Sequence, residues 1–294
     1  MNKKEQSQKE LIQNLYKQPI LCPFMNKLWE VTAETRAIPK LQNPILIEGL
    51  PGIGNVGKIA VDFLVNELKA KKIYSFFSCR FPHSVFVNSK NLVDMPRLEI
   101  YYKQFGKGTK KHDLLFLVGD IQPIDEESCY EFCDEVLKIA RQHKCCYVIT
   151  TGGIGLQQIP DKPKVYCTAN DAKLLAEYKK KGLLAEEDIF GVVSPIIGVS
   201  GILLGLGKRR GVKGVSLLAE TFGHPLYLGI KGAKEILQLL EKKFSLGINL
   251  KKISKNIPAM ENLLFHTTAD WDPEELPQSL AGAQAKKKEA HYIG

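Results

Sequence analysis

The chain has 294 residues, of which 44% are hydrophobic and 25% are charged, so an intrinsically disordered chain and a fibrous repeat are excluded. Lys and Arg number 41 against 32 Asp and Glu, which gives a net charge of +9. The basic residues form short runs, such as residues 179–181 and 208–210, without interleaved aromatic residues. This pattern predicts a mildly basic, solvated surface and no nucleic-acid partner.

Strand-like and helix-like segments alternate along the chain from Pro44 onward. Short apolar runs predict strands, and apolar residues spaced three and four apart predict helices that cover one face of a sheet. The expected strands are residues 45–48, 73–78, 84–87, 97–102, 114–119, 145–150 and 215–219. The expected helices are residues 55–69, a segment that begins after the N-cap Asp125, residues 171–181 and residues 233–244.

This alternation specifies the α/β class, with a mostly parallel sheet and helices on both faces. Residues 1–42 are expected to form an N-terminal arm and a lead-in segment, in which residues 28–40 are irregular or strand-like. Residues 43–266 are expected to form the α/β/α domain. Residues 267–294 lose periodicity, which predicts a flexible C-terminal tail.

A glycine-rich loop between the first strand and the first helix is the most informative segment. Its members are Gly49, Pro51, Gly52, Gly54, Asn55 and Gly57. Three of these glycines fit the pattern G-x-G-x-x-G, but residues 75–79 offer no carboxylate for a ribose, so no nicotinamide cofactor is predicted. Lys58 follows as in a P-loop, but Ile59 stands where that motif needs a hydroxyl. The favoured interpretation is a tight turn for close packing of helix on strand, and the alternative is an anion-binding loop.

Polar groups are also expected at the carboxyl ends of the strands, where open α/β sheets hold their ligands. Besides the glycine loop, these groups are Asp120, Thr151, Gly152, Gly153, Glu220 and Thr221. Two carboxylates, a hydroxyl and backbone N–H groups could bind an anionic or sugar-bearing substrate. The simpler interpretation is that Asp120 and Glu220 cap the helices or loops that follow them.

Other patterns predict neither a metal nor a membrane span. The seven cysteines are odd in number and form no C-x-x-C pair, and the six histidines form no ligand motif, so a reduced, cytoplasmic protein without a metal site is expected. The N-terminal ten residues lack the apolar region of a secretory signal. Residues 189–207 carry no charge, but Pro195 and five glycines divide them into an expected strand, turn and buried helix.

Four motifs occur in order along the chain. They are GLPGIGNVG at residues 49–57, GDIQP at 119–123, GILLGLG at 201–207 followed by Gly211, and LLAET at 217–221. Together they resemble the signature of the archaeal proteasome assembly chaperone family, which is related to a eukaryotic chaperone subunit. The resemblance spans about residues 43–250.

This resemblance implies a three-layer α/β/α fold similar to that of nucleoside phosphorylases and hydrolases, without their chemistry. It also implies a homo-oligomer that binds proteasome α subunits during assembly of the core particle. A C-terminal tail with a penultimate Tyr would dock between adjacent α subunits. Here the chain ends Tyr292, Ile293, Gly294, so the Tyr is third from last, and the extra residue displaces the terminal carboxylate by up to about 3.4 Å.

The sequence therefore favours a non-enzymatic, cytoplasmic chaperone of proteasome assembly that uses no cofactor. The alternative is a small-molecule-binding enzyme, similar to a phosphorylase, hydrolase or ligase, that uses the glycine loop with Asp120 and Glu220.

Overall fold

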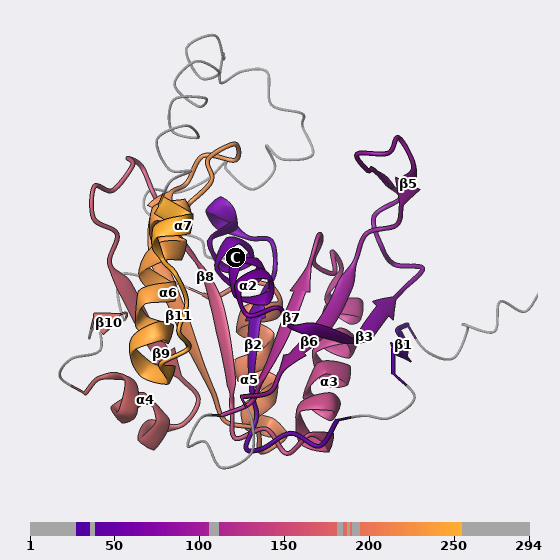
Figure 1. Ribbon diagram of the computed structural model, residues 1–294, viewed down its shortest axis with the longest axis horizontal. Helices are drawn as coiled ribbons and strands as arrows, with labels where there is room; N and C mark the ends of the chain where they lie inside the picture. The colour runs from indigo at the N-terminus through magenta and orange to yellow at the C-terminus, as the bar shows by residue number, and fades with distance from the viewer. Residues whose placement is uncertain are drawn as a thin grey trace, which may run out of the picture.

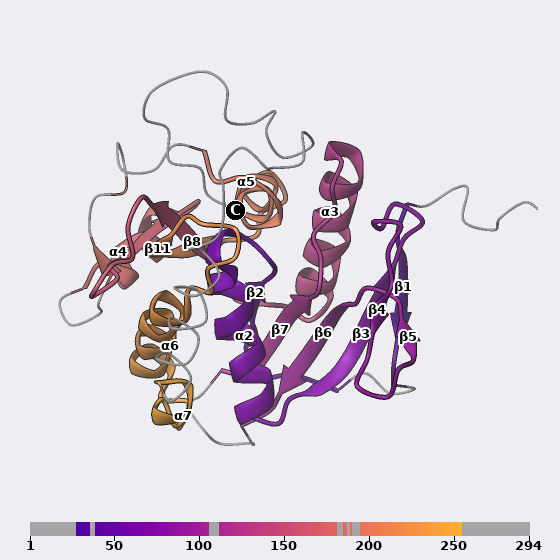
Figure 2. The same cartoon turned by 90° about the horizontal axis from the view of Figure 1, so that it is seen from above.

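A nine-stranded sheet forms the centre of the computed structural model, which describes residues 28–35, 39–105, 112–180, 185–186, 189 and 195–254. Helices cover both faces of the sheet (Figures 1 and 2). The predicted three-layer α/β/α fold is thereby confirmed.

The strands follow the order β1-β3-β6-β7-β2-β8-β11-β9-β10 across the sheet. Their bounds are β1 (Glu30–Ala33), β2 (Ile45–Gly49), β3 (Lys71–Phe77), β6 (Leu98–Lys103), β7 (Leu114–Gly119), β8 (Val148–Leu156), β9 (Val165–Ala169), β10 (Ala185–Glu186) and β11 (Gly214–Phe222). The four central strands β7, β2, β8 and β11 are parallel, whereas β6 pairs antiparallel with both β3 and β7, and β9 pairs antiparallel with β11. The sheet is thus parallel at its centre and mixed at its sides.

The longer helices each turn an apolar face to the sheet, and two helices begin at an Asp N-cap. The helix bounds are η1 (Ile53–Asn55, a 3₁₀ turn), α2 (Val56–Glu67), α3 (Glu126–Gln142), α4 (Ala172–Tyr178), α5 (Val199–Arg209), α6 (Ile230–Phe244) and α7 (Lys251–Ser254). The predicted N-cap of α3 is confirmed, because the Asp125 carboxylate accepts a hydrogen bond of 2.9 Å from the backbone N–H of Ser128. Figure 2 shows α2 and α6 on one face of the sheet and α3 and α5 on the other.

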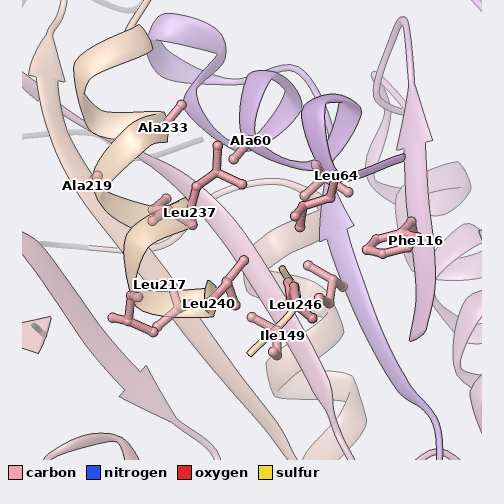
Figure 3. Close-up of a cluster of buried hydrophobic side chains, with 14 of the residues drawn as sticks. Ala60, Leu64, Phe116, Ile149, Leu217, Ala219, Ala233, Leu237, Leu240 and Leu246 are labelled. Carbon is pink, nitrogen blue, oxygen red and sulfur yellow. The ribbon is translucent and has the colours of Figure 1, made fainter. Parts of the chain in front are cut away.

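Successive side chains of β2 point to opposite faces of the sheet and enter a separate hydrophobic core on each face. Ile45 and Ile47 face α2 and α6, and Leu46 faces α3. In the first core, Leu64 of α2 and Leu237 of α6 belong to one cluster between the helices and the sheet and are fully buried (Figure 3). Burial of each such side chain contributes about 1.5–3 kcal/mol, so these contacts hold α2 firmly on the strands that carry the glycine loop.

A short hairpin stands apart from the main sheet. Its strands β4 (Phe86–Val87) and β5 (Val93–Asp94) pair only with each other and lie between β3 and β6 in the chain. In Figure 1 the hairpin projects beyond the end of β3.

Both ends of one expected strand differ clearly from the sequence prediction. The strand expected at residues 145–150 begins only at Val148, because Lys144 takes a left-handed conformation and the N–H of Cys145 still bonds to Ala140 at the end of α3. It then continues to Leu156, because β11 pairs with it residue by residue.

The remaining expectations concern the lead-in segment, residues 189–207 and the C-terminal tail. Residues 30–33 of the expected lead-in segment form β1, and the helix expected within residues 189–207 is α5. No helix in the described ranges is long and apolar enough to cross a membrane. Tyr292, Ile293, Gly294 and the rest of the expected tail lie outside the described residues.

Candidate functional site

The glycine loop leaves β2 and turns directly into η1 and α2. Gly54 has a φ of +60°, a left-handed conformation that glycine adopts without steric cost. Asn55 follows at φ +50°, and asparagine is one of the few other residues that adopt this region. Two successive left-handed residues reverse the chain sharply enough for α2 to lie back over the strands.

The loop is closed against its own sheet. A Cβ atom added at Gly57 would overlap the carbonyl oxygen of Thr151 on β8, and one added at Gly153 would overlap the carbonyl oxygen of Ile53. A Cβ at Gly54 would lie 2.7 Å from Oγ1 of Thr221 on β11. Backbone therefore touches backbone at Gly57 and Gly153, which is the close approach that the tight-turn interpretation of the loop requires.

Hydrogen bonds fix the loop to the strands beside it. The N–H of Gly229 donates to the carbonyl of Gly54 at 2.7 Å, and Oγ1 of Thr151 donates to the carbonyl of Glu48 at 2.8 Å. The structure thus brings together three of the predicted groups: the glycine loop, residues 151–153 and Thr221. Residues 151–153 were predicted to follow the end of a strand. They instead lie within β8.

Asp120 lies at the end of β7, as predicted, and is held in an ion-pair network. Its carboxylate accepts hydrogen bonds from Nε and Nη2 of Arg97 at 2.9 and 3.1 Å, and Nζ of Lys58 on α2 lies 3.5 Å away. Burial acts to raise the pKa of Asp120, but Arg97 and Lys58 outweigh it and hold the pKa below its usual value. These residues line a cavity of about 160 Å³. Within it, the positive charges of Arg97 and Lys58 offset the negative charge of Asp120.

Replacing Asp120 by asparagine is expected to lower the free energy of unfolding at pH 7 by about 1 kcal/mol, a modest value because Arg97 is 59% exposed and solvent screens the pair. A carboxylate with a lowered pKa stabilises the fold above its unfolded pKa, and that contribution is lost as the pH falls through the folded pKa. The difference between variant and wild type should therefore decrease as the pH falls below 3.8, the usual pKa of Asp, and vanish below the folded pKa. Urea unfolding at several pH values measures this difference in the free energy of unfolding. Asp62→Asn, which removes the more exposed partner of Lys58, should have a smaller effect.

Glu220 lies on the opposite face of the sheet from Asp120. β11 continues to Phe222, so Glu220 and Thr221 are neighbours within a strand and their side chains point in opposite directions. Glu220 accepts hydrogen bonds from the backbone N–H of Lys164 at 2.9 Å and from the Tyr166 hydroxyl at 3.1 Å. The alternative in which Asp120 and Glu220 share one strand-end site therefore does not hold for these two side chains.

Two polar side chains near the loop were missed by the sequence analysis. Gln122 bridges two elements: its Nε2 donates to the carbonyl of Pro51, and its Oε1 accepts from the N–H of Val199 at the start of α5. Glu48 is fully buried on β2, where its carboxylate accepts from the N–H of Leu50 and from the Ser200 hydroxyl, both at 2.9 Å. The sequence did carry a signal for Glu48, because it is a glutamate within an otherwise apolar strand.

Exposed apolar side chains gather along one edge of the molecule. β3, β7, β2, β8 and β11 run in the same direction, so the loops that follow them lie along a single edge, at the top of Figure 1. Of the eleven large hydrophobic side chains exposed in the described ranges, all but Tyr130 come from this edge, which we call the apolar edge. Its members are Phe77, Val85, Phe86, Val87, Leu92, Val93, Met95, Ile124, Ile197 and Leu226.

The apolar edge has the character of a protein-binding surface. Exposed apolar side chains that cluster, rather than scatter singly, mark sites of protein interaction. Ile124 is 73% exposed and Leu226 is 55% exposed, so the edge reaches from the hairpin after β3, past the loop after β7, to the loop after β11. Among the described residues, no three His, Cys, Asp or Glu side chains are grouped to hold a metal ion.

Comparison with solved structures shows that proteasome-related proteins share this fold. The chain is 31% identical to PbaB of Pyrococcus furiosus, described as an archaeal proteasome activator, with a TM-score of 0.74 over 82% of this chain and 99% of that one. It is 25% identical to PbaA of the same organism, described as an archaeal homolog of proteasome-assembly chaperone, with a TM-score of 0.66 over 83% of this chain and 92% of that one.

Comparison by sequence agrees with the structural one. An uncharacterised protein of Methanocaldococcus jannaschii is 28% identical over 271 residues, which cover 92% of this chain and 99% of the relative. The model of the PAC2 family matches residues 46–264, which include the glycine loop, Asp120 and β11. The resemblance to archaeal proteasome assembly chaperones is thereby confirmed, and the chain belongs to the PAC2 family.

Proposed function

We propose that this protein is a non-enzymatic, cytoplasmic chaperone of proteasome assembly, a homo-oligomer that binds proteasome α subunits. The observation that carries the proposal is the apolar edge, because it occupies the carboxyl ends of the strands, where an enzyme of this architecture would hold its substrate. The descriptions of PbaB as a proteasome activator and of PbaA as a homolog of a proteasome-assembly chaperone support the same conclusion.

The arrangement of the glycine loop supports binding over chemistry. The loop is seated on β8 by contacts of backbone with backbone and on β11 by contact of Gly54 with the Thr221 side chain, and these contacts explain the glycines at Gly54 and Gly57. Asp120 is neutralised by Arg97 and Lys58, and Glu220 lies on the far face of the sheet. A pair of carboxylates poised over one substrate, which the enzymatic alternative needs, is not formed by these two residues.

Size-exclusion chromatography with purified proteasome α subunits tests the proposal. The full-length chain should co-elute with α subunits at micromolar concentrations. The double variant Ile124→Asp, Leu226→Asp should bind at least about tenfold more weakly, since it places charges in an apolar contact. Tyr130→Ser is the matched control, because Tyr130 is also exposed but lies on α3 outside the apolar edge. Absence of co-elution with the full-length wild type would contradict the proposal.

A thermal-shift screen distinguishes the enzymatic alternative from the proposed function. Nucleotides, nucleosides and inorganic phosphate should leave the midpoint of unfolding unchanged. A specific stabilisation by one of them that is lost in Gly54→Val would instead favour a small-molecule site at the glycine loop. Because Gly54 has a left-handed backbone, the valine variant must first be shown to fold, by circular dichroism.

A further inference from the structure

A cavity with a basic lining opens at the amino ends of the parallel strands, on the edge of the sheet opposite the apolar edge. Its volume is about 430 Å³. Residues just before β7, β8 and β11 form its wall together with α4, which lies at the lower edge in Figure 1, and the end of α6. We call it the basic cavity, and its lining includes Cys146, Lys173, Glu177, Lys213, Lys243 and Phe244.

Positive charge exceeds negative charge in this lining. Three lysines, from α4, from the residue before β11 and from α6, face one carboxylate, that of Glu177. Nζ of Lys243 lies 4.0 Å from Glu177, and Nζ of Lys213 lies 3.5 Å from Asp171, whose carboxylate also caps α4. Among the described residues, no carboxylate forms an ion pair with Lys173. The basic cavity can therefore accept further carboxylates.

Lys243 is the least exposed of the three lysines. Its side chain is 15% exposed, and its Nζ lies 4.0 Å from the centre of the Tyr178 ring. Burial lowers the pKa of Lys243, and repulsion from Lys180 lowers it further, although Glu177 acts in the opposite direction. A partly desolvated ammonium group beside another lysine is stabilised by each carboxylate that approaches it. The basic cavity thus favours an acidic occupant.

The C-terminal tail of this chain contains an acidic segment. We give that name to residues 270–276, with the sequence DWDPEEL, which place four carboxylates in seven positions. No Lys, Arg or His occurs between residues 267 and 285, although the whole chain has a net charge of +9. The acidic segment lies outside the described residues. Its carboxylates complement the three lysines, and Trp271 offers an apolar ring to the half-buried Phe244.

The chain that leads to the acidic segment is long enough to reach the basic cavity. Ile253 lines a cavity with Ile230, at the start of α6, whereas Phe244, at the end of α6, lines the basic cavity. The two places are thus separated by about the length of α6, roughly 22 Å. Residues 255–269 can span up to about 50 Å. Covalent attachment also gives the segment a local concentration that a free acidic partner must exceed to compete.

We propose that the acidic segment binds in the basic cavity of the same chain, with its carboxylates beside the three lysines and Trp271 against Phe244. The contact holds the C-terminal tail at the edge of the sheet opposite the apolar edge, so the apolar edge stays available to other partners. The inference goes beyond the proposed function, because it concerns one chain alone and assigns a binding site that needs no α subunit.

Acrylamide quenching of tryptophan fluorescence in the full-length protein, without α subunits, tests the inference. The chain has two tryptophans, and Trp29 is only 3% exposed, so the quencher reports mainly on Trp271. At low salt, Trp271 should be protected relative to free N-acetyltryptophanamide. Salt at about 1 M should reduce the protection, because it screens the ion pairs. The protection should not change with protein concentration, since segment and cavity belong to one chain.

Charge reversal identifies the groups that bind. Lys173→Glu with Lys213→Glu should lower the equilibrium constant for docking at least about tenfold, because two attractions become repulsions. Both side chains are exposed, so the fold should tolerate the change. Asp272→Lys with Glu274→Lys should restore the protection in that background. A purely structural effect of the two lysines would not be rescued in this way.

Cysteine cross-linking locates the acidic segment. Cys146 lines the basic cavity and is exposed. In a background with Cys22 and Cys79 replaced by serine, Pro273→Cys should form an intramolecular disulfide with Cys146 on mild oxidation. Ala283→Cys, in the same tail but outside the acidic segment, should form that disulfide at least about tenfold more slowly.

Lys90→Glu with Lys208→Glu is the matched control for charge and should leave the protection unchanged, because both lysines are exposed and lie outside the basic cavity. A fully accessible Trp271 at low salt would leave the cavity to an acidic partner from outside and overturn the inference. So would protection that grows with protein concentration, which means a second copy, protection unaffected by the lysine variants, or equal cross-linking rates. Because no measurement contains α subunits, failure to bind them would contradict only the proposed function.

Discussion

Replacing Gly57 by alanine is expected to lower the free energy of unfolding by about 3 kcal/mol. By helix propensity alone the substitution would stabilise α2 by up to about 1 kcal/mol. The new Cβ, however, would overlap the carbonyl oxygen of Thr151 and lie 2.8 Å from its Oγ1. To relieve the overlap, α2 must move away from β8, which loosens the core beneath it. Urea unfolding followed by circular dichroism measures the change.

Two further variants give this prediction its controls. Gly205→Ala makes the same substitution in α5, where an added Cβ meets no atom within 4 Å, and it should stabilise the protein by up to about 1 kcal/mol. Thr151→Ala in the Gly57→Ala background should not restore stability, because the obstructing atom is a backbone carbonyl. A neutral Gly57→Ala would mean that α2 is not seated this closely on β8 and that the glycines have another purpose.

Segments with strong local signals were predicted well from the sequence. The strand expected at residues 114–119 is β7, residue for residue, and Asp125 caps α3 as expected. Strand direction was less accessible, because it depends on pairing between distant segments. β6 and β7 were both expected as strands, but nothing in either segment shows that they run antiparallel to each other. β9 was missed altogether, although its run of Val165, Tyr166 and Cys167 is typical of a strand.

The candidate site shows how one boundary decides what a sequence can predict. Asp120 was placed correctly, because β7 ends at Gly119. Glu220 was not, because β11 extends three residues beyond the predicted end, and within a strand each successive side chain changes face. The apolar edge was missed for a different reason. Seven of its members lie within residues 77–95, but Ile124, Ile197 and Leu226 come from distant parts of the chain, and only the order of the strands brings them to the same edge.

Glu48 makes the free energy of unfolding depend on pH. Its carboxyl group lies on the face of β2 opposite the glycine loop's helix, beneath the first turn of α5. Burial raises the pKa of Glu48 to about 7, against a usual value of 4.5, even though Ser200 and Leu50 donate hydrogen bonds to the charged form. The desolvation cost of the carboxylate thus exceeds what two hydrogen bonds return.

The sign of the effect on stability follows from the raised pKa. The contribution of Glu48 is fully present below pH 4.5 and is lost as the pH rises through about 7, because the unfolded chain releases this proton more readily than the folded one. The loss amounts to about 3 kcal/mol at pH 8, since each unit of pKa corresponds to about 1.4 kcal/mol. Glu48→Gln keeps a hydrogen-bonding group of the same shape and cannot ionise. It should therefore be about 3 kcal/mol more stable than the wild type at pH 8 and nearly equal to it at pH 4.5.

Urea unfolding of the wild type and Glu48→Gln between pH 4.5 and 8 measures this difference. Glu99→Gln is the matched control, because Glu99 is also a buried glutamate but pairs with Lys72 at 3.1 Å and accepts from the Tyr101 hydroxyl at 2.8 Å. Its loss leaves Lys72 with a weaker set of partners, so Glu99→Gln should destabilise the protein at pH 8, opposite in sign to Glu48→Gln. A destabilised Glu48→Gln at pH 8 would mean that the charged carboxylate stabilises the first turn of α5, where the positive end of the helix dipole lies, by more than burial costs it.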